Sequence, residues 1–245
     1  SVKFFYAMKT NDYPSIITTM LEQGYGIDVS SADELNRARV CGAKDFIFSG
    51  PGKSVEELSS VLVITDQVII LLDSFGELER LELVGKKSNG KIRAGVRLMV
   101  EEKGLWRKFG IPLRELKNFF NKAHQCPHVD FCGLQFHSSW NLTPDKQTAF
   151  IQAIGNELRL LDPRDVAKIE FIDAGGGFWP SQGEWLHPSQ TPDGRLRQCL
   201  SSSVEEGMDH RQSPAAPLTD FASAISQAFK EHVFPIAEKE LKNNN

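Results

Sequence analysis

Lys9 is the residue of this chain whose type and position most clearly suggest chemistry. It follows the apolar run Phe4–Met8 and precedes the polar pair Thr10 and Asn11, so it lies at the C-terminal end of a predicted strand. In barrel enzymes the C-terminal strand ends carry the reacting groups. A lysine amine that is partly desolvated and held there can lose its proton and attack a carbonyl carbon, forming a Schiff base. A solvated lysine with no chemical role is the alternative interpretation of the same local pattern.

Two further polar clusters end predicted strands. His137 closes an apolar run, and its imidazole could stack on a flat ligand, transfer a proton, or simply be a hydrogen-bonded structural group. The triplet Gly175, Gly176 and Gly177 follows Asp173, and glycines let backbone N–H groups turn towards an anion without obstruction by Cβ atoms. A glycine triplet can also be no more than a tight turn.

Two charged residues interrupt apolar strands. Asp28 lies in the run Gly26–Val29, and Arg97 lies between Val96 and Leu98. A charge in such a place is costly unless it is paired or exposed at a site. The two residues could therefore pair with each other, with neighbours, or with a ligand.

A metal site is not expected, although one group of residues has ligand-like spacing. His124, Cys126 and His128 lie close together in sequence. They fall at the end of a predicted helix, where cationic side chains are favourable without any metal.

The elements that must position these residues alternate along the chain. Short apolar runs are followed by segments with apolar residues at three- and four-residue steps, a βα pattern. We expect strands at Val2–Met8, Gly26–Val29, Phe46–Phe48, Val68–Leu72, Arg93–Val100, Phe131–His137 and Lys168–Asp173. We expect helices at Tyr13–Gln23, Ala32–Cys41, Ser54–Val63, Phe75–Val84, Pro112–His124, Pro144–Leu161 and Phe221–Phe229. The pattern predicts an α/β fold, a TIM-type (β/α)8 barrel in which no eighth strand is recognised.

Length and charge are consistent with one barrel domain over residues 1–245. The 245 residues can bury a substantial core, and 28 basic against 32 acidic residues give net charge −4, which makes nucleic acid an unexpected partner. The four cysteines show no paired framework, and neither a signal peptide nor an apolar run of membrane length is visible, so a cytoplasmic location is expected. Residues 181–217, rich in Ser, Pro, Gln, Asp and Gly, are predicted to be a loop or insertion within the domain.

Six motifs, taken in order, resemble the fold-type III pyridoxal-phosphate decarboxylases. These enzymes act on ornithine, lysine, arginine, diaminopimelate or carboxynorspermidine. The motifs are Tyr6-Ala7-Met8-Lys9-Thr10-Asn11, Asp28-Val29-Ser30-Ser31-Ala32-Asp33-Glu34-Leu35, Phe48-Ser49-Gly50-Pro51-Gly52-Lys53, Lys108-Phe109-Gly110-Ile111, the His137 cluster, and Asp173-Ala174-Gly175-Gly176-Gly177-Phe178. Six motifs in the family's order are a far more specific signal than any one of them.

The resemblance implies a barrel of the alanine racemase-like type that binds pyridoxal 5'-phosphate and decarboxylates a basic or diamino acid. By this resemblance Lys9 is the Schiff-base lysine and His137 stacks on the cofactor ring, which makes both catalytic. The triplet Gly175–Gly177 would cradle the phosphate. Lys9, Asp28, Arg97, His137, Ser139, Gly175, Gly176 and Gly177 are the expected cofactor-binding residues. A small amino-acid substrate and a homodimer are implied in the same way.

The chain also departs from the family pattern. Trp140 occupies the position where the family has a phosphate-binding serine, so Ser138 or Ser139 would have to supply the hydroxyl. The family's Glu-Pro-Gly-Arg motif, its C-terminal β domain and its N-terminal β segment are not found. The chain therefore resembles the barrel portion, and we expect the complete protein to be the enzyme and this portion alone to be inactive or nearly so.

Two alternatives share most of these features. One is an amino-acid racemase-like barrel that binds the same cofactor. The other is a non-catalytic homologue with a regulatory role, as antizyme inhibitor has in the same family. Retention of Lys9 argues against a pure binding role, which needs no reactive amine.

Overall fold

The computed structural model describes residues 1–88, 90–101, 108–179, 199 and 215–236. They belong to two compact units, one made of residues 1–136 and 161–173 and the other of residues 137–160 and 174–245. The expectation of a single domain over residues 1–245, with a loop at 181–217, stays a prediction. Of that loop, all but residues 199 and 215–217 lie outside the described residues.

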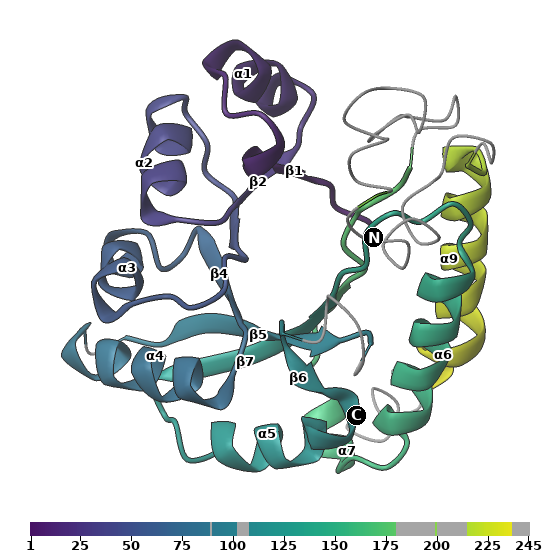
Figure 1. The fold of residues 1–245 in the computed structure, drawn as a ribbon. Coiled ribbons are helices and arrows are strands. Elements are labelled where there is room, and N and C mark those ends of the chain that lie inside the picture. Colours follow the sequence, from purple (N-terminus) through teal and green to yellow (C-terminus); the bar gives the residue numbers. More distant parts are fainter. Residues whose placement is uncertain (89, 102–107, 180–198, 200–214, 237–245) are drawn as a thin grey trace. The chain divides into compact units, whose positions relative to one another are not determined.

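The first unit is built on a parallel sheet in which seven strands follow one another in chain order (Figure 1). They are β1 (Phe5–Ala7), β2 (Gly26–Val29), β3 (Phe46–Phe48), β4 (Val68–Leu72), β5 (Ile92–Met99), β7 (Val129–Phe136) and β8 (Phe171–Asp173). Each corresponds to a predicted strand, so the parallel barrel-type fold is confirmed. The short strand β6 (Ile111–Pro112) pairs with β5 and was not predicted.

Helices follow the strands and cover one face of this sheet (Figure 1). They are α1 (Pro14–Glu22), α2 (Ala32–Val40), α3 (Val55–Ser60), α4 (Phe75–Ser88), α5 (Leu116–Ala123) and α7 (Pro163–Val166). Local sequence fixes several helix starts. Ser54 and Glu57 form a reciprocal capping box on α3, and Ser31 caps α2 by accepting from the N–H of Glu34.

Three 3-10 turns modify the predicted elements. They are η1 (Met8–Thr10), η2 (Val61–Val63) and η3 (Leu113–Glu115). The turn η1 ends β1 before Met8, so the first strand is shorter than predicted. The turns η2 and η3 replace the end of one predicted helix and the start of another. The helix α7, of one turn, was not predicted.

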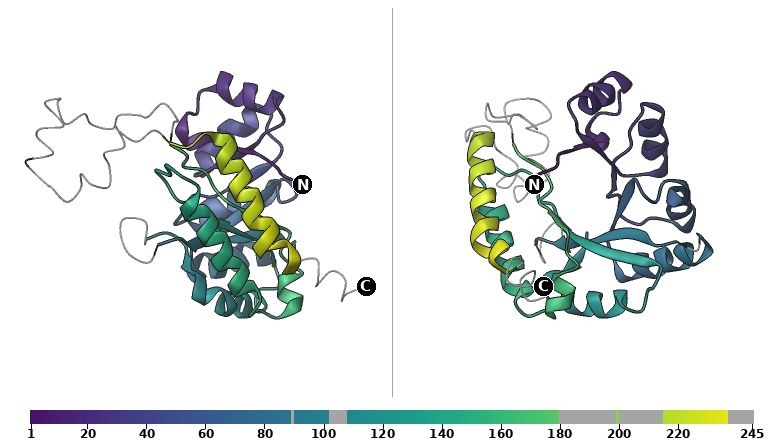
Figure 2. Two further views of the ribbon diagram at one scale, coloured as in Figure 1. Left: turned by 90° about the vertical axis from the view of Figure 1, so that its right-hand side faces the viewer. Right: turned by 180° about the vertical axis from the view of Figure 1, so that it is seen from behind.

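The second unit contains two long helices, α6 (Asp145–Leu158) and α9 (Leu218–His232), which pack side by side (Figure 2). Gly155 makes this approach possible, because a Cβ atom there would lie 2.3 Å from the backbone oxygen of His232. An edge-to-face pair of Phe178 and Phe221, with ring centroids 4.9 Å apart, fixes the start of α9 against the chain that follows the glycine triplet.

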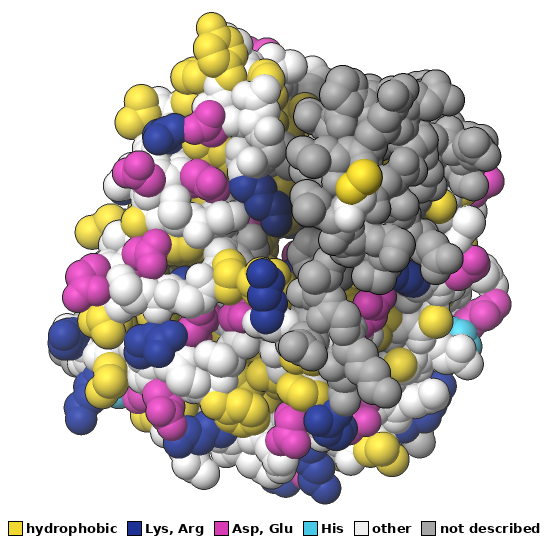
Figure 3. Space-filling model, viewed as in Figure 1, with side chains coloured by type: hydrophobic (Ala, Val, Ile, Leu, Met, Phe, Trp, Pro, Cys, Tyr) yellow, Lys and Arg dark blue, Asp and Glu magenta, His cyan; other side chains and the backbone are white. Residues whose placement is uncertain are grey.

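The charged side chains of the described residues are distributed without segregation by sign on the face drawn in Figure 3, where acidic and basic groups alternate. Within the described part of the chain, no helix is both long and apolar enough to cross a membrane.

Candidate functional site

Lys9 lies in the turn η1, two residues after the end of β1 and at the C-terminal edge of the sheet, as predicted. Two hydrogen bonds hold its turn: the hydroxyl of Thr10 donates to the backbone oxygen of Ala7 at 2.8 Å, and the hydroxyl of Tyr6 donates to that of Asn11 at 2.9 Å. The Lys9 side chain itself is exposed. The partial desolvation expected from the sequence is therefore not provided by the described residues, because Lys9 lies in the turn η1 beyond the end of β1. The amine is accessible to a ligand.

Asp28, on β2, lies next to Ala7 in the parallel register. Its Oδ1 atom is buried and has no hydrogen-bond partner among the described residues, although the side chain also bonds to Ser49. Burial raises the pKa of Asp28 to about 6, and the hydrogen bond from Ser49 opposes that rise. The charge of Asp173 raises this pKa further, whereas the charge of Lys9 lowers it. The Lys9 amine therefore lies within electrostatic range of a carboxylate that has one unused acceptor.

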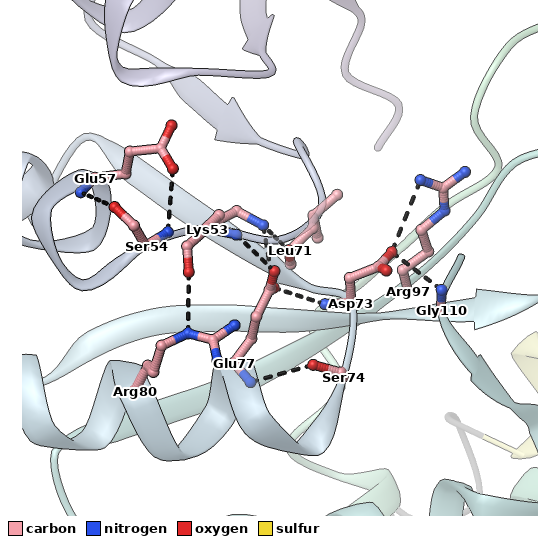
Figure 4. A network of polar contacts seen from close by, with 10 residues as sticks. All are labelled: Lys53, Ser54, Glu57, Leu71, Asp73, Ser74, Glu77, Arg80, Arg97 and Gly110. Atoms are coloured by element: carbon pink, nitrogen blue, oxygen red, sulfur yellow. Dashed lines mark hydrogen bonds and ion pairs between the residues drawn. The ribbon is translucent and has the colours of Figure 1, made fainter. Parts of the chain in front are cut away.

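Arg97, on β5, pairs with Asp73 rather than with Asp28. Its Nη1 atom lies 3.9 Å from Oδ1 of Asp73, and both side chains are 13% exposed (Figure 4). The same Asp73 oxygen accepts from the N–H of Gly110 at 3.0 Å, and the ring of Phe109 lies 4.8 Å from the guanidinium. Burial lowers the pKa of Arg97, and the charges of Asp73 and, less strongly, Asp28 oppose that shift. This arrangement anchors the Lys108-Phe109-Gly110 motif to the end of β4.

Polar side chains of three neighbouring strands, Arg97, Gln135 and Asp173, form a polar layer across the sheet. Arg97 lies beside Gln135 of β7, and Gln135 lies beside Asp173 of β8, so in the parallel register the three side chains share one face. The negative charges of Asp73, Asp28 and Asp173 all oppose the lowering of the Arg97 pKa by burial, and of these three acids Asp73 is the one that forms an ion pair with Arg97.

Gln135 was not predicted as a site residue. It is buried, and its Oε1 atom has no partner among the described residues. The available sequence signal was an amide inside the apolar run Phe131–Phe136. Together, Gln135 Oε1 and Asp28 Oδ1 are buried acceptors that require donors, and buried acceptors are normally satisfied. The layer therefore suits a ligand that carries N–H or O–H groups or a positive charge.

A buried ion pair supports the strand ends beneath this layer. The Lys53 ammonium donates to the backbone oxygen of Leu71 at 2.6 Å and lies 3.3 Å from Glu77 Oε2 (Figure 4). The Glu77 carboxylate also accepts from the N–H groups of Lys53 and Asp73, at 2.9 and 2.8 Å. Burial lowers the pKa of Lys53, and the negative charge of Glu77 opposes that shift. Glu77 therefore fixes the backbone from which Asp73 reaches Arg97.

In the second unit, the His137 imidazole is held from both sides. The N–H of Gly176 donates to its Nδ1 atom at 3.3 Å, and its Nε2 atom lies 3.0 Å from the hydroxyl oxygen of Ser139. The structure therefore brings three of the predicted site features, His137, Ser139 and the glycine triplet, into contact. Their roles towards the cofactor stay predictions.

The glycines of the triplet have different roles. Gly175 and Gly177 adopt positive φ angles of 62° and 83°, which L side chains rarely adopt. A Cβ atom on Gly177 would also lie 2.1 Å from the backbone oxygen of Ser138. Gly176 is the opposite case, because a Cβ atom there would meet no atom within 4 Å. The turn thus leaves open space beside Gly176.

The histidines of the ligand-like sequence pattern are engaged elsewhere. Nε2 of His124 lies 2.7 Å from Asp165, and Nδ1 of His128 lies 2.7 Å from Glu82. Within the ranges the structure describes, no group of three or more His, Cys, Asp or Glu residues could hold a metal ion.

Comparison with known proteins decides the family. The model of the pyridoxal-binding domain of pyridoxal-dependent decarboxylases matches residues 1–236. The chain belongs to this family. The family expected from the six motifs is thereby confirmed, and so is its pyridoxal cofactor.

Two curated decarboxylases illustrate the degree of similarity. Diaminopimelate decarboxylase of Campylobacter jejuni is 32% identical over 192 residues, which are 72% of this chain and 46% of that protein. L-glutamyl-[BtrI acyl-carrier protein] decarboxylase of Niallia circulans is 26% identical over 223 residues, which are 86% of this chain and 51% of that protein. The chain spans about half the length of the curated relatives it matches.

Solved structures show the same fold. The crystal structure of diaminopimelate decarboxylase from Helicobacter pylori complexed with L-lysine matches 93% of this chain and 54% of that one, with a TM-score of 0.71 and 22% sequence identity. At this identity the match supports the barrel fold alone.

The residues present fit the cofactor of this decarboxylase family on three points. The Lys9 amine is exposed and open to an aldehyde. The space beside Gly176, which a Cβ atom would fill, suits a phosphate group. The unused Oδ1 acceptor of Asp28 suits a donor near the amine. The departure at Trp140 also has an answer, because the hydroxyl that the structure places beside His137 belongs to Ser139.

Proposed function

We propose that the protein is a pyridoxal-phosphate-dependent amino-acid decarboxylase in which Lys9 carries the cofactor by Schiff-base exchange. The observation that carries the proposal is the position of Lys9: its accessible amine follows β1 and acts electrostatically on Asp28, in a chain of the pyridoxal-binding family. The motif order supports the same assignment.

Asp28 has a defined task in this proposal. Its Oδ1 atom is the buried acceptor nearest in register to the strand that carries Lys9. With a pKa of about 6, the carboxyl group is mostly ionised at neutral pH and can hold a proton at Oδ1 as the pH falls. Asp28 can therefore accept a hydrogen bond or a proton when the amine must become neutral to attack an aldehyde.

The proposed phosphate and ring contacts come from residues of the second unit. We assign phosphate binding to Gly175, Gly176 and Gly177 with the hydroxyl of Ser139, and stacking on the cofactor ring to His137. The open space at Gly176 and the bond between Ser139 and His137 support this assignment. When bound, the cofactor supplies a ring that accepts the electron pair left by the departing carboxylate.

The proposed substrate is a basic or diamino acid. Two features support this class: the three acids whose negative charges act on the pKa of Arg97, and the names of the diaminopimelate decarboxylases among the relatives. The family resemblance also supports a homodimer in the cytoplasm. Because one relative acts on a glutamyl group linked to a carrier protein, carrier-linked glutamate belongs among the substrates to be tested.

The test uses the natural full-length protein. Addition of pyridoxal phosphate should produce a visible absorption band that borohydride abolishes, with the reduced label mapped to Lys9 by mass spectrometry. The Lys9→Ala variant should not be labelled. Carbon dioxide release from diaminopimelate, lysine, ornithine, arginine or carrier-linked glutamate would then support decarboxylation. Exchange of the α-proton without carbon dioxide release would support the racemase-like alternative, and a label with neither activity would support a regulatory role.

A further inference from the structure

Asn141 connects the His137 loop to the glycine triplet, although neither its sequence position nor the family motifs give it a role. The residue is buried, with 2% of its surface exposed. The Nδ2 group donates to the backbone oxygens of Ser138 at 3.0 Å and of Gly177 at 3.2 Å, with Gly176 at 3.5 Å. A single amide therefore bridges three carbonyl groups from two segments that lie more than thirty residues apart in sequence.

Further bonds fix Asn141 itself. Its Oδ1 atom accepts from the hydroxyl of Ser138 at 3.0 Å. Its backbone N–H donates to Gly177, and its backbone oxygen accepts from Trp179, at 3.0 and 3.1 Å. A buried amide with both ends satisfied is held in one orientation, because every alternative would leave a polar atom without a partner.

The orientation of the turn determines the state of His137. The N–H of Gly176 can donate only to a ring nitrogen that carries a lone pair, so Nδ1 is unprotonated. In the neutral imidazole Nε2 then carries the proton and donates to Ser139 Oγ. The Ser139 hydroxyl accepts that bond, and its own hydrogen remains available to a further acceptor.

We propose that Asn141 is the positioning residue of a phosphate-monoester subsite. By bridging Ser138 and Gly177 it holds the turn so that Gly176 faces open space and keeps His137 as the neutral Nε2–H tautomer, and Ser139 is left as a donor to the phosphate. The inference rests on the proposed function, since it names the residue that organises the phosphate end of the same site. It also explains how the site works with Trp140 in place of a serine.

The Asn141→Asp variant tests this role with little change in volume. A carboxylate at this position cannot donate to the backbone oxygens of Ser138 and Gly177, and it faces them with negative charge. Asn156→Asp is a matched control: Asn156 is exposed on α6 in the same unit, and its Oδ1 accepts from Arg159. Asn141→Ser, which adds no charge and reaches fewer carbonyls, serves if the aspartate variant does not fold.

The first measurement compares capture of pyridoxal phosphate and pyridoxal by Lys9, trapped with borohydride in the full-length protein. Pyridoxal has the same aldehyde but no phosphate. The wild type and Asn156→Asp should prefer pyridoxal phosphate, whereas Asn141→Asp or Asn141→Ser should lose that preference at least tenfold and capture pyridoxal within twofold of the wild type. An unchanged preference in a folded Asn141 variant would overturn the proposal.

The second measurement does not depend on Lys9. Nitrogen-15 NMR of histidine-labelled protein should show an unprotonated Nδ1 and a protonated Nε2 for His137, and inorganic phosphate should shift these signals. In the Asn141 variants the tautomer should become mixed and the phosphate response should be lost. If neither aldehyde reaches Lys9 but the NMR results hold, the proposed function fails and the phosphate subsite stands. A wild-type spectrum with phosphate response in folded Asn141→Asp would refute the subsite role directly.

Discussion

The buried pair of Lys53 and Glu77 allows the sharpest test of how the site is supported. Both side chains are 1% exposed, so removal of one partner leaves an uncompensated charge in the interior. We expect Lys53→Met to lower the free energy of unfolding by about 3–5 kcal/mol. In Glu77→Gln an amide NH2 group replaces one carboxylate oxygen, so the backbone N–H of either Lys53 or Asp73 also loses its acceptor. That adds about 1–3 kcal/mol, giving about 4–8 kcal/mol in all.

The double variant separates charge pairing from packing. In Lys53→Met/Glu77→Gln neither charge is left alone, so its loss should be smaller than the sum of the single losses by about 2 kcal/mol or more. Urea denaturation followed by far-UV circular dichroism measures all three variants. Glu170→Gln is the control, because Glu170 pairs with Arg93 at the surface and its removal should cost less than about 1 kcal/mol. Additive single losses, or single variants within about 1 kcal/mol of the wild type, would refute this account.

Three further predictions concern the site itself. Burial raises the pKa of Asp28 from 3.8 to about 6, so the folded state binds the proton more tightly and the free energy of unfolding falls as the pH rises from 4 to 7. Asp28→Asn should remove this fall of about 3 kcal/mol, and equal dependence of stability on pH in wild type and variant would contradict it. Gly177→Ala should lower the free energy of unfolding by about 1–3 kcal/mol, because of the positive φ angle and the clash of the new Cβ atom with the Ser138 backbone oxygen. Gly176→Ala should leave the free energy of unfolding unchanged or raise it by up to about 1 kcal/mol, and should weaken phosphate binding. Equal stability losses in the two variants would contradict the turn geometry. Gln135→Met should raise the free energy of unfolding of the ligand-free protein by about 1 kcal/mol, since it removes a buried acceptor that has no partner among the described residues. A lower free energy of unfolding would show that the amide oxygen is satisfied.

The parallel fold could be predicted because its signals are local. The alternation of apolar runs with helical periods located seven of the eight described strands of the sheet and missed the short strand β6, and the end of β8 at Asp173 agrees with prediction. Strand ends also located residues that could take part in chemistry, since His137 follows β7 directly and Lys9 lies two residues after β1. The lengths of the strands were less predictable: β1 ends at Ala7, because Met8 already belongs to the turn η1.

The partners of the charged residues could not be predicted, because they depend on contacts between distant segments. The sequence left open whether Arg97 pairs with Asp28, with a neighbour or with a ligand, and the structure places Asp73 3.9 Å from it. Asn141 gave no sequence signal, since its role depends on carbonyl groups from the glycine triplet. Gln135 gave only a weak one, an amide in an apolar strand.

The exposure of Lys9 is the clearest difference from expectation. The sequence pattern indicated a partly buried amine, but the turn η1 leaves the side chain accessible. Its electrostatic link is with Asp28, whose burial could not be inferred from the motif alone. A chemical role of Lys9 is therefore supported by its accessibility to a ligand and by the charge of Asp28, and not by desolvation of the amine.

The most direct test of the central claim is the site of covalent capture. Full-length protein is incubated with pyridoxal phosphate, reduced with borohydride and digested, and the modified peptide is identified by mass spectrometry. The account predicts one predominant label, on Lys9, and none in Lys9→Ala. A label confined to other lysines, or an unlabelled Lys9 in folded protein, would contradict it.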